Sequence, residues 1–152
     1  MKKLRLVLGA DHAGYEIKEF IKEYLKKKHY EFDDLGTDST KSVDYPVYAE
    51  KVAGAVKKHR NTKGVLTCGT GIGAAIAANK IPGIRAALVS NPEEARLSIE
   101  HNNANILTLG GRPFDKINVT RILDAWLAAK FQGGRHLRRV KEIDAIERKY
   151  MK

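Results

Sequence analysis

The sequence has a single cysteine, Cys68, among its 152 residues. One cysteine excludes an internal disulfide framework and any zinc site built from several cysteines, and it is typical of a protein in a reducing compartment. The five histidines show no metal-ligand spacing with carboxylates. We therefore expect a chain without disulfides and without a metal site.

Long apolar runs are missing as well. No segment approaches the roughly 20 apolar residues that cross a bilayer. The basic residues 1–5 lead into an apolar run that ends at 9–12, which does not form a secretory signal peptide. We expect a cytoplasmic protein with no membrane partner.

Aromatic residues are scarce, at 7% of the chain, and acidic residues are outnumbered. There are 28 Lys and Arg against 18 Asp and Glu, a net charge of +10. Such a charge could serve nucleic-acid binding, but the basic residues are dispersed, and most fall near the ends of expected helices, where cations complement the helix dipole. We expect the charge to attract a small anionic substrate, and a nucleic-acid-binding module is the third interpretation that we keep.

The apolar pattern alternates between short buried strands and amphipathic helices. The spacing predicts strands over 4–8, 30–35, 65–68, 85–89 and 106–109, and helices over 15–28, 46–58, 72–80, 91–101, 116–131 and 135–150. Alternating units of this kind predict a five-stranded parallel sheet covered on both faces. The expected fold class is α/β, a three-layer αβα sandwich of Rossmann-like type with an extra C-terminal helix, in one domain over residues 1–152.

In parallel sheets, ligands bind beyond the carboxyl ends of the strands. Asp11 and His12 follow the first strand, Cys68 ends the third, and residues 110–112 follow the fifth. These residues are distant in the sequence. We expect them to meet at one edge of the sheet.

The most informative segment runs from Cys68 to Gly73, a glycine-rich turn between a strand and a helix. Such a turn leaves backbone N–H groups unpaired and directed at one point, where they favour an anion. A thiol at the positive end of a helix is favoured as thiolate, so the segment offers a base or nucleophile beside an oxyanion site. The alternative is a small buried cysteine that only packs.

The same turn also fits a dinucleotide-binding loop. Residues 69–74 satisfy G-x-G-x-x-G/A, and Glu93 and Glu94 lie about twenty residues further on. The acid of such a loop ends a strand, whereas these two glutamates stand in a helix start, and a dinucleotide has no use for the thiol. A dinucleotide-binding oxidoreductase is our second interpretation. A P-loop is excluded because Lys80 comes too late and no Ser or Thr follows it.

Several polar residues have a structural and a functional interpretation. Asp11 and His12 could cap a helix, residues 101–103 could form a helix end, and Tyr45 is more typical of packing. Arg135 and Arg139 are one helical turn apart, so they could grip a phosphate or belong to a solvated face. Together, a thiol, an imidazole, an aspartate, a backbone anion site and paired arginines indicate proton transfer on a phosphorylated carbonyl compound.

Motifs along essentially the whole chain resemble the ribose-5-phosphate isomerase B family, within the larger group that includes the galactose-6-phosphate isomerase subunits. The motifs are Asp11–Gly14, Asp44–Pro46, Cys68–Gly73, Ile76–Lys80, Gly83–Ala86, His101–Asn105 and Gly133–His136 with Arg139. The resemblance implies an aldose–ketose isomerase that interconverts D-ribose 5-phosphate and D-ribulose 5-phosphate through an enediolate. A hexose-6-phosphate isomerase, acting on allose or galactose 6-phosphate, is the alternative within the family. The family uses no metal and no organic cofactor.

The resemblance also implies the roles of individual residues. Cys68 is the base between C1 and C2, His101 the acid of ring opening, and Asp11 acts on a sugar hydroxyl, with Thr70 as a further catalytic residue. The expected substrate-binding residues are Asp11, His12, Tyr45, Gly69, Thr70, Gly71, Ile72, Gly73, Asn102, Arg112, Arg135 and Arg139. The family builds its site between two subunits, with His101 from the neighbour, so we expect a homodimer or homotetramer.

One branch of the family has serine in place of the cysteine and uses a glutamate just after the glycine loop. This chain has Ala74 and Ala75 there, so only the cysteine mechanism is open to it. The segment 112–115 departs from the family pattern after its arginine.

Overall fold

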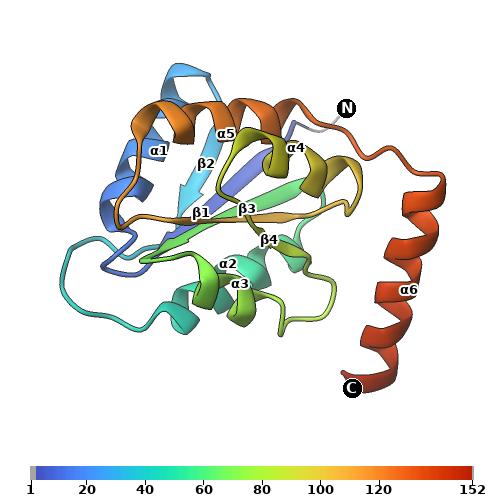
Figure 1. The fold of residues 1–152 in the computed structure, drawn as a ribbon. Coiled ribbons are helices and arrows are strands. Elements are labelled where there is room, and N and C mark those ends of the chain that lie inside the picture. The colour runs from blue at the N-terminus through green and yellow to red at the C-terminus, as the bar shows by residue number, and fades with distance from the viewer. Residues whose placement is uncertain (1–2, 152) are drawn as a thin grey trace.

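Five parallel strands form one sheet in the computed structural model, which describes residues 3–151 (Figure 1). The strands are β1 (Arg5–Ala10), β2 (Glu31–Asp34), β3 (Thr62–Cys68), β4 (Ala86–Leu88) and β5 (Ile106–Gly110). Their order across the sheet is β2-β1-β3-β5-β4, and every neighbouring pair is parallel. The predicted parallel sheet is confirmed.

Helices cover both faces of the sheet. They are α1 (Tyr15–Lys27), α2 (Tyr45–Lys58), α3 (Ile72–Ala78), α4 (Pro92–Glu100), α5 (Lys116–Ala128) and α6 (Arg135–Tyr150). Figure 1 shows α1, α4 and α5 on one side and α2 and α3 on the other, with α6 standing apart from the three layers. The three-layer αβα sandwich with an additional C-terminal helix is therefore confirmed.

Some predicted boundaries were wrong by a few residues. β3 begins at Thr62, three residues earlier than the predicted strand, because Thr62 pairs with Arg5 of β1. α5 ends at Ala128, short of the predicted residue 131, since Ala129 has an extended backbone and the Gln132 N–H then donates to the carbonyl of Glu100 at 3.0 Å. Contacts with a distant element decided both limits.

The starts of α4 and α5 follow local capping chemistry. The Asn91 side chain accepts the Glu94 N–H at the start of α4, and Pro92 occupies the first turn. The Asp115 carboxylate accepts two N–H groups of the first turn of α5. These caps direct the loops that follow β4 and β5 into helices that run back along the sheet.

Apolar side chains form two buried clusters, one on each face of the sheet. Alternate residues of β1 divide between them, because successive side chains of a strand point to opposite faces. Leu6 and Leu8 join the cluster under α1, α4 and α5, which includes the fully buried Trp126. Val7 joins the cluster under α2 and α3, and so does Cys68. The thiol therefore lies on the α2 and α3 side of the sheet.

The order of connections changes direction between β1 and β3, which is where ligands enter sheets of this type. The register places Ala10 beside Thr67 and Cys68 beside Gly110. The loops after β1, β3 and β5 therefore lie level with one another. They also lie very close, since a Cβ atom on Gly14 would come within 2.3 Å of the Thr67 carbonyl.

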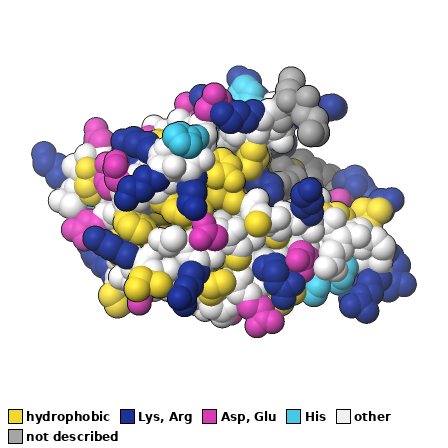
Figure 2. All heavy atoms as spheres, turned by 90° about the horizontal axis from the view of Figure 1, so that it is seen from above, with side chains coloured by type: hydrophobic (Ala, Val, Ile, Leu, Met, Phe, Trp, Pro, Cys, Tyr) yellow, Lys and Arg dark blue, Asp and Glu magenta, His cyan; other side chains and the backbone are white. Residues whose placement is uncertain are grey.

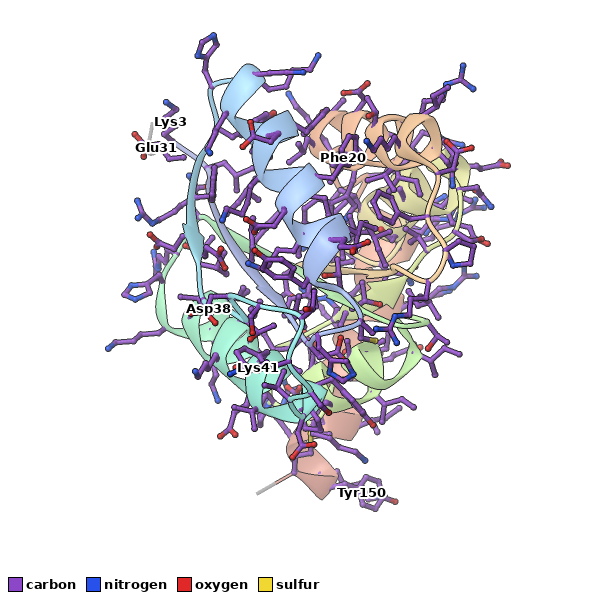
Figure 3. All side chains as sticks on the ribbon, turned by 90° about the vertical axis from the view of Figure 1, so that its left-hand side faces the viewer. Lys3, Phe20, Glu31, Asp38, Lys41 and Tyr150 are labelled. Atoms are coloured by element: carbon purple, nitrogen blue, oxygen red, sulfur yellow. The ribbon has the colours of Figure 1, made fainter. Side chains whose placement is uncertain are left out.

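α6 leaves much of its apolar surface uncovered. Leu137, Ile143 and Ile146 are exposed along it, and Tyr150 is exposed at its far end, where Figure 3 shows the ring directed away from the body of the chain. Arg85 lies 3.5 Å from Asp144, and the Gly83 N–H donates to Glu147 at 2.7 Å. These two polar contacts connect the second half of α6 to the turn before β4.

On the face shown in Figure 2, acidic groups lie among the Lys and Arg side chains, and no single basic patch dominates. Across residues 3–151, no helix has the length and apolar character needed to cross a membrane.

Candidate active site

Cys68 ends β3 with its side chain only 4% exposed. Its Sγ accepts the backbone N–H of Gly71 at 3.1 Å. A thiolate accepts such a donor more strongly than a thiol does. Gly71 reaches the sulfur because its φ is +81°, and a Cβ atom there would come within 2.6 Å of Leu88 and 2.9 Å of the Leu109 backbone. The turn therefore requires glycine at position 71.

Some N–H groups of the glycine loop are used within the loop, and others have no acceptor among the described residues. The Ile72 N–H donates to the Thr70 hydroxyl oxygen at 3.1 Å, and the Gly71 N–H is occupied by sulfur. Within residues 3–151, the N–H groups of Gly69, Thr70 and Gly73 have no acceptor. Three N–H groups thus remain available to an oxyanion, fewer than the whole segment 69–73 that the sequence suggested.

Asp11 continues β1 by one residue and lies level with Cys68 on the neighbouring strand, so the two backbones are about 4.8 Å apart. The Asp11 side chain is buried, and its Oδ1 accepts the Gly14 N–H at 2.9 Å. In the described part of the chain its second oxygen has no partner. The capping interpretation and the functional one are therefore compatible, because each uses a different oxygen.

His12 points to the loop before α2. Its Nδ1 lies 3.1 Å from the Val43 nitrogen and 3.2 Å from the Val43 oxygen. This contact orients the ring and leaves Nε2 without a partner among residues 3–151. No motif in the sequence pointed to Val43, whose side chain is not part of the contact.

Tyr45 and Arg112 lie against the glycine loop from two sides. The Tyr45 ring lies so close to Gly73 that a Cβ atom there would come within 2.6 Å of it. The Arg112 N–H donates to the Gly69 carbonyl at 3.2 Å, and the Gly111 N–H donates to the Cys68 carbonyl at 2.8 Å. The predicted meeting of the loops after β1, β3 and β5 is confirmed.

His101, Asn102, Arg135 and Arg139 lie at the other end of the strands, beyond their amino ends. α4 runs antiparallel to the strands, so His101 and Asn102 at its end precede β5. β5 rises about 13 Å from Ile106 to Gly110, and Gly110 is the residue level with Cys68. Figure 1 shows α6, with Arg135 and Arg139, beyond the amino ends of the strands. One copy of the chain therefore does not bring Cys68 and His101 together.

His101 belongs to a second polar cluster. Its ring stacks on that of His136, the second residue of α6, with 4.1 Å between centroids and 10° between planes. Arg85 Nε donates to the carbonyls of Asn102 and Asn103 at 3.0 and 3.1 Å. His136 is buried, whereas Arg135 and Arg139 next to it are exposed.

Burial lowers the pKa of His136 below the usual value of a histidine. Positive charge on His101, Arg135 and Arg139 acts in the same direction, and Glu100 opposes them. The sequence indicated His101 and the two arginines but assigned no role to His136. Only its place in the motif that ends in Arg139 could have drawn attention to it.

A cavity of about 710 Å³ lies beside Gly69, Thr70 and Arg112 but is not lined by Cys68. Ile17, Val119 and Ile122 form its floor on the α1 and α5 side of the sheet, whereas the sulfur lies on the other side. Because the thiol does not line this cavity, we do not assign the reaction to it. Within the described range, no group of three or more His, Cys, Asp or Glu side chains is placed to hold a metal ion.

The structure does not favour the dinucleotide interpretation. Glu94 lies in the first turn of α4, where its Oε2 accepts the N–H and the hydroxyl of Ser90 at 2.6 and 3.0 Å. Glu93 is in the same turn and pairs with Arg96. Neither acid ends a strand, where a dinucleotide ribose would need it.

Comparison with known proteins covers nearly the whole chain. Residues 6–143 match the Ribose/Galactose Isomerase family. Ribose-5-phosphate isomerase B of Escherichia coli (strain K12) is 45% identical over 149 residues, which cover 98% of this chain and 99% of that protein.

Solved structures agree with this match. Ribose-5-phosphate isomerase B of Clostridium thermocellum has a TM-score of 0.94 at 51% identity, covering 97% of this chain and 99% of the other. The enzyme of Mycoplasma genitalium, solved with bound ribulose-5-phosphate, has a TM-score of 0.92 at 39% identity, covering 97% and 99%. The resemblance found in the motifs is confirmed, and the chain belongs to the ribose/galactose isomerase family.

Proposed function

We propose that this chain interconverts D-ribose 5-phosphate and D-ribulose 5-phosphate in the non-oxidative branch of the pentose phosphate pathway. The observation that carries the proposal is the Cys68 sulfur, hydrogen-bonded at the head of a loop with three unpaired N–H groups. A thiol base beside an oxyanion site is what a proton shift next to a carbonyl needs. The structure of the Mycoplasma genitalium relative with bound ribulose-5-phosphate supports this choice of substrate.

The reaction begins with the opening of the furanose ring. The C1–O4 bond breaks, and O4 takes the electron pair together with a proton from His101. Asp11, through the oxygen that Gly14 does not occupy, takes the proton of the C1 hydroxyl. C1 becomes an aldehyde carbon. Imidazole suits the acid role because histidine exchanges its proton near neutral pH.

The isomerisation then moves a proton from C2 to C1. The Cys68 thiolate removes the C2 proton, the electron pair forms the C1–C2 double bond, and negative charge develops on O1. The N–H groups of Gly69, Thr70 and Gly73 stabilise this charge. The Thr70 hydroxyl passes the O2 proton to O1, and Cys68 returns its proton to C1, which completes the ketose.

The phosphate group binds to the two arginines of α6. Arg135 and Arg139 are both exposed and one helical turn apart, so they project in the same direction. Guanidinium groups form charge-assisted hydrogen bonds to phosphate. His12 contributes from the glycine-loop side, and Asn102 and Arg112 contact the sugar and the phosphate.

The thiol and the glycine loop lie at the carboxyl ends of the strands, whereas His101 and the arginines lie beyond the amino ends. We therefore propose that the site forms between two copies of the chain. Cys68, Asp11 and the glycine loop come from one copy, and His101 and the arginines from the other. The uncovered Leu137, Ile143 and Ile146 of α6 support a homodimer, because they would be buried against the partner. A free catalytic thiol also needs a reducing compartment, and we propose the cytoplasm.

A turnover assay tests the substrate. The purified chain is given ribose 5-phosphate, allose 6-phosphate and galactose 6-phosphate, with the Cys68→Ala variant as the control for contaminating isomerases. We expect the highest kcat/KM for ribose 5-phosphate. A higher value for either hexose phosphate would assign the chain to hexose 6-phosphate isomerisation instead.

A further inference from the structure

His136 takes no part in the chemistry described above, yet it lies in direct contact with the proposed ring-opening acid. The residue is 7% exposed, and its ring lies nearly parallel to that of His101. The two rings come from different elements, His101 from the end of α4 and His136 from the first turn of α6. The contact therefore connects the turn that carries the acid to the helix that carries the phosphate-binding arginines.

Both sides of the stack are held in place by backbone contacts. The His136 N–H donates to the Gly133 carbonyl at 3.0 Å, and the Gln132 N–H donates to the carbonyl of Glu100 at 3.0 Å. On the other side, Arg85 holds the carbonyls of the two residues that follow His101. With both backbones held, the His101 ring can rotate about its side-chain bonds only by losing its face contact with His136.

We propose that His136 is a positioning residue for His101, and that the face-to-face stack keeps the plane of the His101 imidazole fixed. This inference rests on the proposed role of His101 in ring opening. His136 itself touches no substrate in this scheme. It acts through the orientation and the charge of its neighbour.

The charges around the pair act on the protonation of His136. His136 faces His101 and Glu100 from the end of α4, and Arg135 and Arg139 from its own helix. Burial, His101 and the two arginines all disfavour a proton on His136. Two imidazolium rings at 4.1 Å would repel each other, so a proton on one ring disfavours a proton on the other. The lowered pKa of His136 favours the neutral form of that ring.

Kinetics of His136→Ala and His136→Phe test the positioning. Turnover of ribose 5-phosphate requires ring opening, whereas exchange of the C1 hydrogen of ribulose 5-phosphate with D₂O does not. We expect His136→Ala to lower kcat for ribose 5-phosphate about tenfold, with KM and the exchange rate changed less than about twofold. His136→Phe keeps a flat ring against His101 and should recover most of the lost kcat.

NMR titration of His136 tests the charge coupling of the two rings without any substrate. We expect the His136 Cε1–H resonance to titrate below the usual pH of a histidine, and at a higher pH in His101→Asn, where the charge of His101 is lost. His59→Ala, which removes an exposed histidine at the end of α2, is the control and should leave kcat and the His136 titration unchanged.

Three results would overturn the inference. They are an unchanged kcat in His136→Ala, an equal loss of ribose 5-phosphate turnover and exchange, or a His136 titration that is the same in His101→Asn as in the wild-type protein. A rise in KM without a fall in kcat would mean that His136 only docks α6. Failure of the proposed function looks different, because the wild-type chain would then not turn over ribose 5-phosphate, while the titration would still test the pairing.

Discussion

A site shared between two chains can be tested by mixing two inactive variants. Cys68→Ala removes the base and His101→Asn removes the ring-opening acid. Cys68 is level with Gly110, about 13 Å along β5 from Ile106, and His101 lies five residues further back along the chain. Reacting groups must approach to roughly 3–3.5 Å, so the two side chains of one copy cannot act on the same sugar.

The expected recovery follows from two-fold symmetry. When equal amounts of the two variants pair at random, half of the dimers are mixed. Each mixed dimer has one site with both defects and one site with neither. About one quarter of the wild-type sites should therefore be restored. If each site were built within one chain, the mixture would have no activity.

The assay is ribose 5-phosphate turnover after the two variants are unfolded and refolded together, with each variant alone as the blank. Native mass spectrometry measures the mixed dimers. A matched control mixes wild-type chains with the double variant that carries both substitutions. Shared sites then leave about one quarter of the activity of an all-wild-type sample, whereas sites within one chain leave about half. Mixed dimers without restored activity would refute the shared site.

Five further substitutions have expected outcomes. Cys68→Ala should lower kcat by roughly 10²–10⁴-fold with little change in KM, because the base acts on C2 and does not hold the phosphate, and an active variant would exclude Cys68 as base. Arg135→Ala and Arg139→Ala should each raise KM about 10- to 150-fold, as charge-assisted bonds of roughly 1.5–3 kcal/mol are lost, and an unchanged KM would place the phosphate elsewhere. Burial alone would raise the pKa of Asp34, but hydrogen bonds from two lysines, Lys18 among them, hold it below its usual value. That lowered pKa stabilises the fold above about pH 4, and the contribution is lost as the pH falls through the pKa of the folded state. Asp34→Asn should therefore cost about 2–3 kcal/mol in urea unfolding at pH 7, because the buried Lys18 ammonium loses its main partner, and the cost should shrink as the pH falls through the pKa of Asp34 in the folded state. Lys18→Met should cost less than Asp34→Asn, and an equal cost would contradict this account.

Much of the fold could be predicted from local patterns. The change of apolar period from strand to helix, the Asn91–Pro92 helix start and the glycine loop each lie within a few residues, so their physical causes can be read in the sequence. The meeting of Asp11 with Cys68 also followed, since the carboxyl ends of parallel strands share one edge of a sheet.

Part of the site depended on how distant elements pack. The sequence placed five N–H groups around one anion, but the left-handed backbone of Gly71 directs its N–H to sulfur, and the Thr70 hydroxyl accepts that of Ile72. A ring in contact with His101 could not be predicted either, because residue 136 is 35 positions away. Such contacts depend on side-chain geometry and not on residue type.

The sequence by itself therefore determined the parallel sheet, the loop that holds the thiol and the residue types of the chemistry, because each depends on periodicity or on a short motif. The tertiary structure alone decided that β5 lies between β3 and β4, that Cys68 and His101 lie at opposite ends of the strands, and that His136 stacks on His101. The physical reason is that strand order and helix docking are decided by which buried surfaces fit together. That fit is a property of whole elements and cannot be read from any short segment of the chain.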